Sequence, residues 1–261
     1  MSAQTRLVED FAVPQIEFAG VSKKYQRLII DNLNFAVAKG EFLSIIGPSG
    51  CGKSTVLKLI SGLATATSGS ILVDGMTPGN ARETISFIFQ DPTLLPWRTV
   101  RANAVLGLEL ERMPKEKREI RVDSLLELVG LSHVSRAYPR ELSGGMKMRL
   151  SIARALVTGP RLLLMDEPFA ALDEMTRDRM NEELLRLRDE LKWTVAFVTH
   201  SVSEAVFLST RILVLAPSPG RIHADLPVNL PNPRTAELRA TLEFEQTVTA
   251  VSRILRGARS A

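Results

Sequence analysis

A glycine-rich run at residues 47–54 is the part of the chain best suited to chemistry. It reads Gly-Pro-Ser-Gly-Cys-Gly-Lys-Ser, which fits the pattern G-x-x-x-x-G-K-[ST] between an apolar run and a predicted helix. Glycines let consecutive backbone N–H groups curl around phosphate oxygens, and the helix N-terminus adds positive potential. Lys53 could then reach the outer phosphates of a nucleotide, and the Ser54 hydroxyl could ligate Mg²⁺. The run therefore predicts a phosphate-binding loop.

A pair of acids, Asp166 and Glu167, follows the apolar run at residues 162–165. Asp166 is placed to hold Mg²⁺ through water, and Glu167 is placed to polarise an attacking water molecule. Acids often end strands, so the pair alone would indicate little. Downstream of a phosphate loop, it predicts that the bound nucleotide is hydrolysed.

A second segment suited to phosphate lies at residues 142–145, which read Leu-Ser-Gly-Gly. Ser143 is a good N-cap for the helix predicted from Met146, and the glycines leave backbone amides exposed. As an ordinary helix-capping turn this segment would be unremarkable. Beside the other two motifs it indicates a second phosphate-facing helix N-terminus.

The elements that must position these motifs follow from hydrophobic patterning. Short apolar or alternating runs predict strands at residues 33–37, 42–46, 71–73, 85–89, 162–165, 195–198 and 212–215. Apolar residues three and four apart predict helices at 56–63, 122–129, 146–157, 180–191 and 244–255. In the fourth of these helices, Glu182 and Arg186 are expected to form an i, i+4 ion pair. Strands and helices alternate around a helical block from about residue 94, which predicts an α/β fold with an inserted helical subdomain.

The composition excludes several classes of protein. Of the 261 residues, 45% are apolar and 24% are charged, as in a soluble globular domain. The single cysteine, Cys51, excludes a disulfide-framed secreted protein. Residues 1–14 lack the apolar core of a secretory signal, and no apolar run could span a bilayer. The net charge of +4 is compatible with an anionic partner, but an ordinary solvated surface explains it equally well. We therefore expect a cytosolic protein whose membrane role, if any, comes through a partner.

In order and spacing, these motifs resemble those of the ATP-binding-cassette (ABC) ATPases, over residues 16–222. The resemblance implies an α/β phosphate-loop NTPase core (RecA-like) with an antiparallel β-subdomain and an inserted α-helical subdomain. It places the ATPase domain at residues 14–231, with the helical subdomain at about 95–157. A C-terminal helical tail would then occupy residues 232–261.

The resemblance also implies a role for each matching residue. The expected catalytic residues are Lys53, Glu167 and His200. The expected ATP-binding residues are Tyr25, which would stack on adenine, Gly47, Pro48, Ser49, Gly50, Cys51, Gly52, Lys53, Ser54, Thr55 and Gln90. Mg²⁺ is expected to contact Ser54, Gln90 and Asp166. The residues expected to face the ATP of a partner subunit are Leu142, Ser143, Gly144, Gly145 and Asp173. Because Cys51 lies in the loop, a bulky thiol reagent is expected to block ATP binding.

ABC ATPases bind two ATP molecules between two head-to-tail domains. This chain carries one copy of each motif, so the resemblance implies a second copy or a homologous subunit. Two positions depart from the family pattern, since Met146 and Met148 stand where glutamine is common. Neither position supplies the phosphate-facing amides, but the rate of hydrolysis could differ from that of the family.

A smaller group within the family is indicated by several local sequences. They are Leu-Leu-Pro-Trp at 94–97, the run at 103–108, Phe-Ala-Ala-Leu-Asp at 169–173, Pro-Gly-Arg-Ile at 219–222 and Leu-Pro-Asn-Pro-Arg at 230–234. They resemble the nitrate, sulfonate and taurine importer ATPases. That resemblance implies an integral-membrane permease, an extracytoplasmic solute-binding protein, a location at the cytoplasmic face of the inner membrane and no nucleic-acid partner. An exporter ATPase, a non-transport ATPase and a regulatory module that only binds ATP stay open as alternatives.

Overall fold

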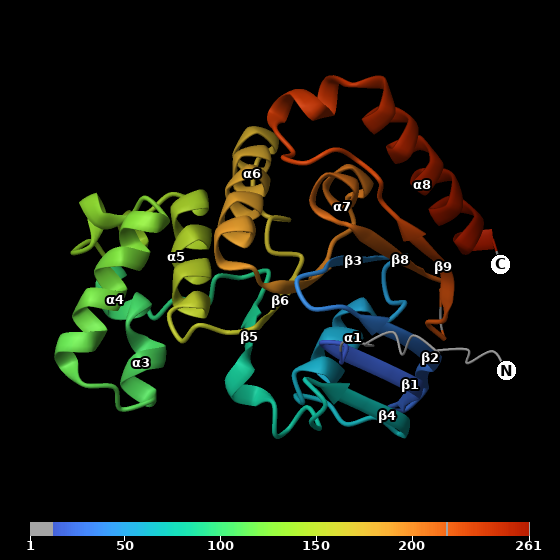
Figure 1. Ribbon diagram of the computed structural model, residues 1–261, viewed down its shortest axis with the longest axis horizontal. Helices are drawn as coiled ribbons and strands as arrows, with labels where there is room; N and C mark the ends of the chain where they lie inside the picture. The colour runs from blue at the N-terminus through green and yellow to red at the C-terminus, as the bar shows by residue number, and fades with distance from the viewer. Residues whose placement is uncertain (1–12, 218, 261) are drawn as a thin grey trace, which may run out of the picture.

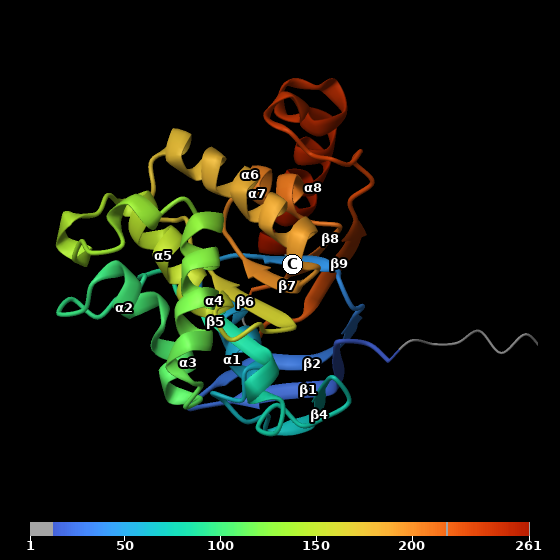
Figure 2. The same cartoon turned by 60° about the vertical axis from the view of Figure 1, so that its left-hand side comes forward.

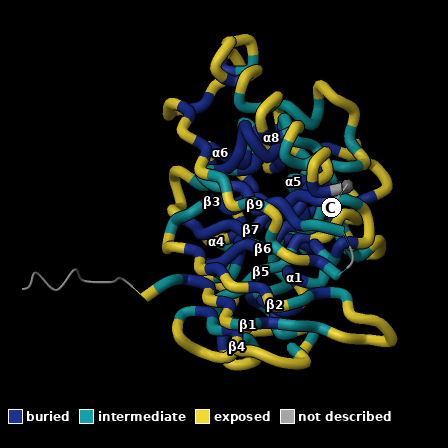
Figure 3. The backbone as a smooth tube through the Cα atoms, turned by 90° about the vertical axis from the view of Figure 1, so that its right-hand side faces the viewer, coloured by how far each residue is buried: buried dark blue, intermediate teal, exposed yellow. Residues whose placement is uncertain are grey.

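The computed structural model describes residues 13–217 and 219–260, which form two sheets with helices around them (Figure 1). The interpretation of the N-terminus at residues 1–12 lies outside the described residues. Buried backbone is concentrated in the strands of the larger sheet, and the exposed segments lie mostly in loops and outer helices (Figure 3).

The larger sheet has six strands in the order β5-β6-β7-β3-β8-β9. Their bounds are β3 Phe42–Ile46, β5 Ile85–Ile88, β6 Leu162–Asp166, β7 Thr194–Val198, β8 Arg211–Leu215 and β9 Ile222–Pro227. All neighbours pair in parallel except β8 and β9. β3 and β7 are buried along their whole length, as expected for parallel strands covered on both faces. The carboxyl ends of β3, β6 and β7 therefore meet at one edge.

The smaller sheet is antiparallel, with the order β2-β1-β4. Its strands are β1 Ile16–Lys24, β2 Leu28–Val37 and β4 Ser68–Val73. Helix α1, Lys53–Ile60, packs between the two sheets, where its buried side chains join one apolar cluster with residues of β1, β2, β3 and β6 (Figure 2). The small sheet is thus held against the large one through the helix that follows β3.

A helical block lies to one side of the large sheet (Figure 1). It consists of α2 Val100–Ala104, α3 Leu106–Leu110, α4 Lys115–Leu128 and α5 Gly144–Leu156, with 3-10 turns at Ser132–Val134 and Pro139–Glu141. Helix α4 begins seven residues before the helix predicted at 122–129 and ends at Leu128, where Gly130 adopts a φ of 67° directly after the cap residue. Arg101 ties α2 to α4 through ion pairs with Glu119 and Asp123.

The remaining helices cover the other face of the large sheet. They are α6 Glu174–Leu191, α7 Val202–Leu208 and α8 Leu242–Ser260, with a 3-10 turn, η4, at Ala236–Ala240 before α8. Helix α7 packs on β3, on α6 and on α8. The rings of Phe207 and Phe244 meet edge to face at 6.4 Å between centroids. The C-terminal segment is therefore part of the apolar core.

The α/β fold with an inserted helical block is confirmed, and all seven predicted strands are present, β3 with the predicted bounds and the other six with one end shifted. The prediction missed β1, β9, α7 and the two short helices α2 and α3. The helix expected at 56–63 begins at Lys53, because the phosphate loop opens directly into it, and ends at Ile60. The prediction that Glu182 pairs with Arg186 is wrong, because Arg186 instead pairs with Glu190 at 3.5 Å. No helix in the described part of the chain is both long and apolar enough to cross a membrane.

Arg234 fastens the start of the C-terminal segment to the core. Its Nη1 donates to the carbonyls of Val206 at 3.2 Å, Phe207 at 2.9 Å and Ser209 at 2.7 Å. These carbonyls lie at the end of α7, where a helix leaves its last C=O groups without intrahelical partners. Burial lowers the pKa of Arg234 to about 10, so the guanidinium stays cationic at neutral pH.

Replacement of Arg234 by methionine should destabilise the protein strongly. The variant leaves buried carbonyls without a donor, which should lower the free energy of unfolding by about 2–4 kcal/mol. Urea unfolding followed by circular dichroism measures this change. Arg253→Met, at an exposed position of α8, is the matched control. Equal urea midpoints for the two variants would contradict the role of Arg234.

Candidate functional site

The phosphate loop connects β3 to α1 and has the backbone geometry that its glycines allow. Gly52, directly before α1, has a φ of 101°. A Cβ atom at this position would also lie 2.5 Å from Cδ1 of Ile30. Both the conformation and the close approach of β2 therefore require glycine here. The N-terminus of α1 consequently faces the cavity described below, and no side chain caps its backbone N–H groups.

Lys53 lies at the first position of α1 and is buried. Its Nζ donates to the carbonyls of Gly47 at 3.0 Å and Pro48 at 3.2 Å. The ammonium group is thus held at the loop itself, beside the helix N-terminus. Two positive features, a cation and a helix dipole, converge where an anionic phosphate group would sit.

Ser54 and Asp166 join the first turn of α1 to the end of β6. The Ser54 Oγ donates to Asp166 Oδ1 at 2.9 Å. Burial raises the pKa of Asp166, and the hydrogen bond from Ser54 opposes this rise. A hydroxyl and a carboxylate are the hard oxygen ligands that Mg²⁺ prefers, usually with phosphate and water completing its shell. The pair therefore fits Mg²⁺, although the described residues contain no cluster of three or more carboxylate, imidazole or thiol groups.

Glu167 and His200 face each other across the ends of β6 and β7. Their Oε2 and Nδ1 atoms lie 3.3 Å apart. Glu167 has a φ of 48°, which is uncommon for a residue with a side chain, and its N–H donates to the Val198 carbonyl at 2.9 Å. The neighbouring strand thus holds Glu167 in a strained conformation. Such strain is typical of functional sites.

Gly52, Lys53, Ser54 and Glu167 border one cavity of about 370 Å³, within the size range of ligand pockets. Asp166 and His200 are not among its lining residues and join it through Ser54 and Glu167. Its lining consists of Tyr25, Ile29, Ser49, Gly50, Gly52, Lys53, Ser54, Thr55 and Glu167. Tyr25 is half exposed at the rim, with Lys23 Nζ 4.5 Å from its ring centroid. The sequence motifs missed Ile29, which carries no signal beyond that of an apolar strand residue.

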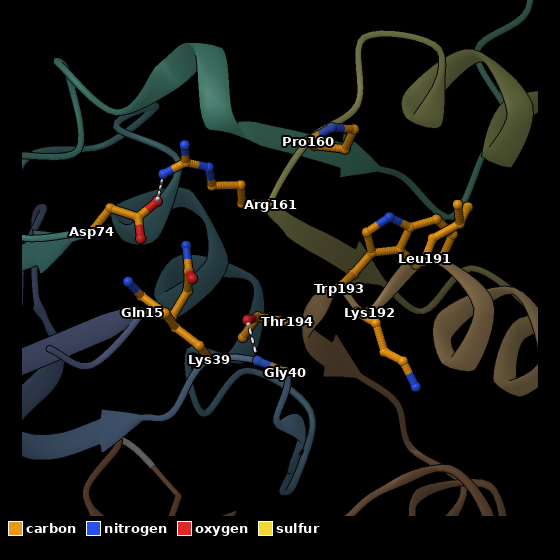
Figure 4. Close-up of a pocket in the computed structure, with 10 residues that line it drawn as sticks. All are labelled: Gln15, Lys39, Gly40, Asp74, Pro160, Arg161, Leu191, Lys192, Trp193 and Thr194. Carbon is orange, nitrogen blue, oxygen red and sulfur yellow. Dashed lines mark hydrogen bonds and ion pairs between the residues drawn. The ribbon is translucent and has the colours of Figure 1, made fainter. Parts of the chain in front are cut away.

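A second cavity, of about 330 Å³, lies at the opposite edge, where β3, β6 and β7 begin (Figure 4). The Gly40 N–H donates to Thr194 Oγ1 at 2.9 Å there, and Arg161 Nη1 lies 3.9 Å from Asp74 Oδ2. Ligands of open α/β sheets bind beyond the carboxyl ends of the strands. Among the described residues that line this second cavity, none belongs to a loop that leads into the N-terminus of a helix. The phosphate-loop cavity is therefore the candidate site.

Several predicted site residues lie outside the cavity within one chain. Ser143 caps α5 by accepting from the Met146 N–H at 3.3 Å, and Asp173 caps α6 by accepting from the Thr176 N–H at 3.0 Å. Gln90 is exposed after β5. None of these three, nor Leu142, Gly144 or Gly145, is among the described residues that line the cavity. A single chain thus brings the phosphate loop, Asp166, Glu167 and His200 together and keeps the 142–145 segment apart.

The family model for ABC transporters matches residues 30–170, a stretch that includes the phosphate loop, the 142–145 segment and the acid pair. The chain belongs to the ABC transporter family. As an ABC ATPase it binds and hydrolyses ATP, and the geometry of Lys53, Glu167 and His200 is consistent with that activity.

Several similar proteins align with nearly the whole length of this ABC ATPase. It is 43% identical to a nitrate import ATP-binding protein of Synechocystis, over 91% of each chain. It is 41% identical to an aliphatic sulfonates import ATP-binding protein of Bacillus cereus, over 89% of this chain and 94% of the relative. A putative ATP-binding protein of Brucella abortus is 46% identical over 88% of this chain and 89% of its own length.

Two solved structures share the fold. One is cbiO1 of Clostridium perfringens, part of an ABC transporter complex, with a TM-score of 0.78 and 26% identity over 93% of this chain and 98% of its own. The other is the dimeric ATP-binding cassette MJ0796 in a post-hydrolysis state with ADP and Pi. It has a TM-score of 0.73 and 31% identity, over 82% of this chain and 99% of its own.

Cys51 should react slowly with thiol reagents in the folded protein. It is only 1% exposed, and burial raises the pKa of its thiol, which lowers the fraction of reactive thiolate. We expect labelling by a small aromatic disulfide to be at least about tenfold slower in the native protein than in urea. Because Cys51 is the single cysteine, the absorbance change reports this site alone. Equal rates would contradict this prediction and show that the loop opens readily. Whether the labelled protein still binds ATP then tests the expectation that a bulky thiol reagent blocks the site.

Proposed function

We propose that this ABC ATPase powers an importer of small anions of the nitrate or organosulfonate type. The proposal of import and of solute class draws on the relatives that carry those names. The observation that carries the hydrolytic part is the convergence of Ser54 with Asp166 and of Glu167 with His200 at one edge of the sheet.

In the proposed mechanism, the amides of residues 47–55 and the Lys53 ammonium bind the nucleotide phosphates. Tyr25, at the rim of the cavity, stacks on the adenine ring. Ser54, Asp166 and Gln90 would hold Mg²⁺, which would neutralise phosphate charge when bound. Glu167 accepts a proton from the attacking water, and His200 holds Glu167 and the terminal phosphate in place.

A second copy of the chain completes the site in this proposal. The 142–145 segment and Asp173 lie at helix N-termini and are not among the described residues that line the chain's own cavity. In the proposed dimer, both serve an ATP bound to the partner subunit. The dimeric state of MJ0796 supports this arrangement, because that cassette aligns over nearly its whole length. Each ATP would then be contacted from both sides, and hydrolysis would weaken the contact between subunits.

The permease is proposed to contact the segment between β5 and α2. Asn103 is fully buried there and fixes the loop, since its Nδ2 donates to the carbonyls of Leu95 at 3.1 Å and Arg98 at 3.0 Å. Leu94 packs against the core, so local packing explains it. Trp97, in contrast, is 72% exposed on this rigid loop. A large apolar ring held outward is suited to a partner surface.

The remaining parts of the proposal concern organisation and place. The ATPase domain spans residues 14–231, its helical subdomain about 95–157, and the tail 232–261. The dimer sits at the cytoplasmic face of the cell membrane through the permease, in a complex with an extracytoplasmic solute-binding protein. No role with nucleic acid is proposed.

Replacement of Glu167 by glutamine should abolish turnover without preventing ATP binding. The amide cannot accept the proton of the attacking water, so ATP hydrolysis should fall by about 100-fold or more. The ATP-bound protein should then accumulate as a dimer in size-exclusion chromatography with Mg²⁺ and ATP. Glu243→Gln, at an exposed position of α8, is the control. Normal turnover in the Glu167 variant would remove this residue from its proposed role.

Trp97→Ala should separate the ATPase from its permease. We expect the ATPase rate of the isolated subunit to be unchanged and its stimulation by the co-purified permease to be lost, since a buried interface aromatic commonly contributes about 2 kcal/mol or more. Leu110→Ala, on α3, is matched in exposure at 77% and should behave like the parent protein. Full stimulation of the Trp97 variant would place the permease contact elsewhere. Uptake by the complex in proteoliposomes distinguishes import from export.

A further inference from the structure

A buried carboxylate lies beneath the loop that carries His200. Glu204, on α7, is 5% exposed, and its Oε2 accepts a hydrogen bond from the Thr199 hydroxyl. The same Thr199 oxygen accepts from the Ser201 N–H at 3.0 Å. The Thr199 hydroxyl therefore connects Thr199 and Ser201, the two neighbours of His200, and Glu204 holds this hydroxyl in place.

The other oxygen of Glu204 connects to the C-terminal segment through α6. Asn181 lies between the two and is 1% exposed. When its side-chain amide is oriented so that both neighbours are satisfied, its nitrogen donates to Glu204 Oε1 at 3.3 Å and its oxygen accepts from Arg239 Nη2 at 3.1 Å. Arg239 belongs to η4, directly before α8, and Figure 1 shows α7 between α6 and the C-terminal segment. The three polar residues thus form a relay from the tail to the His200 loop.

Arg239 is itself held firmly in this position. Its Nη2 lies 3.0 Å from Asp178 Oδ1 on α6. Its guanidinium carbon lies 3.8 Å from the centroid of the Phe207 ring on α7, a cation–π distance. The tail therefore contacts both helices that carry the relay.

The positive charge of Arg239 favours the ionised form of Glu204. A buried carboxylate needs hydrogen-bond donors and nearby positive charge to stay ionised. Burial raises the pKa of Glu204, while Thr199, Arg177, His200 and Arg239 all act to lower it. The ionised form is the stronger acceptor for Thr199 and Asn181, so the cation from the tail favours the form that holds the His200 loop most firmly.

We infer that Glu204 and Arg239 are positioning residues for His200, so that the C-terminal segment helps to set the rate of ATP hydrolysis. This inference rests on the catalytic role proposed for His200. A purely structural role would hold the tail in place without altering catalysis. The two roles differ because only a positioning role lowers kcat.

The first experiment measures ATP hydrolysis by Arg239→Met, which keeps an apolar stem over Phe207 and removes the charge and donors. We expect kcat to fall about tenfold with the KM for ATP unchanged, as for a group that acts on the transition state. Arg239→Lys, which keeps the charge, should recover part of kcat. Arg253→Met is the matched control in the same segment. A kcat equal to that of the control would overturn the inference.

The second experiment tests the route through His200 with a double-mutant cycle. In the His200→Ala background, Arg239→Met should have no further effect on the single-turnover rate, because the group that it positions is absent. Additive effects would overturn the inference and leave the proposed function intact. A His200→Ala variant with normal hydrolysis would overturn the proposed role of His200 as well. If Arg239→Met lowers the melting temperature strongly, Glu204→Gln in the same cycle replaces it, with the same outcomes deciding.

Discussion

Parallel hydrogen bonding between β6, β7 and β3 holds the ATP site together. In this pairing Asp166 lies opposite Val198, and Val198 lies opposite Ile45. The three strands therefore end level with one another, and each is followed directly by reactive groups. Two hydrogen bonds continue the alignment past the strands, from the Glu167 N–H to Val198 and from the Thr199 N–H to Ile45. A slip of one residue in this register would turn Asp166 away from Ser54.

The buried apolar strands also stabilise a conformation that is locally unfavourable. Glu167, which carries a side chain, has a left-handed backbone with a φ of 48°. Strain of this kind costs of order 1–3 kcal/mol at a residue with a side chain and persists only where the surroundings over-determine it. The surroundings here are strands whose side chains are almost wholly excluded from water.

The sequence predicts those features whose signal is local. The phosphate loop is recognisable because glycine and lysine spacing is itself the requirement. β3 and β7 are recognisable because a strand buried on both faces is a short, mainly apolar run, interrupted in β3 only by Ser44. In contrast, α7 has only seven residues, too few to show a helical period. β9 does alternate, with Ile222, Ala224 and Leu226 between exposed residues, but the run is short and ends in proline, and the prediction overlooked it. The relay of Glu204, Asn181 and Arg239 has no local signal at all. It joins residues from three helical elements whose charges look like those of an ordinary solvated surface.

Helix α6 explains how these distant parts act on one site. Its N-cap is Asp173, in the segment proposed to face the partner subunit. Arg177 donates to the Phe169 and Leu172 carbonyls and so holds the loop that follows Glu167. Further along, Asn181 carries the relay to the tail, and Arg186 donates to the Leu128 carbonyl of the helical block at 2.8 Å. At 1.5 Å per residue its 18 residues span about 27 Å. Because one continuous helix makes all these contacts, a displacement of the helical block would act on Asp173, on the loop that follows Glu167 and on the tail together.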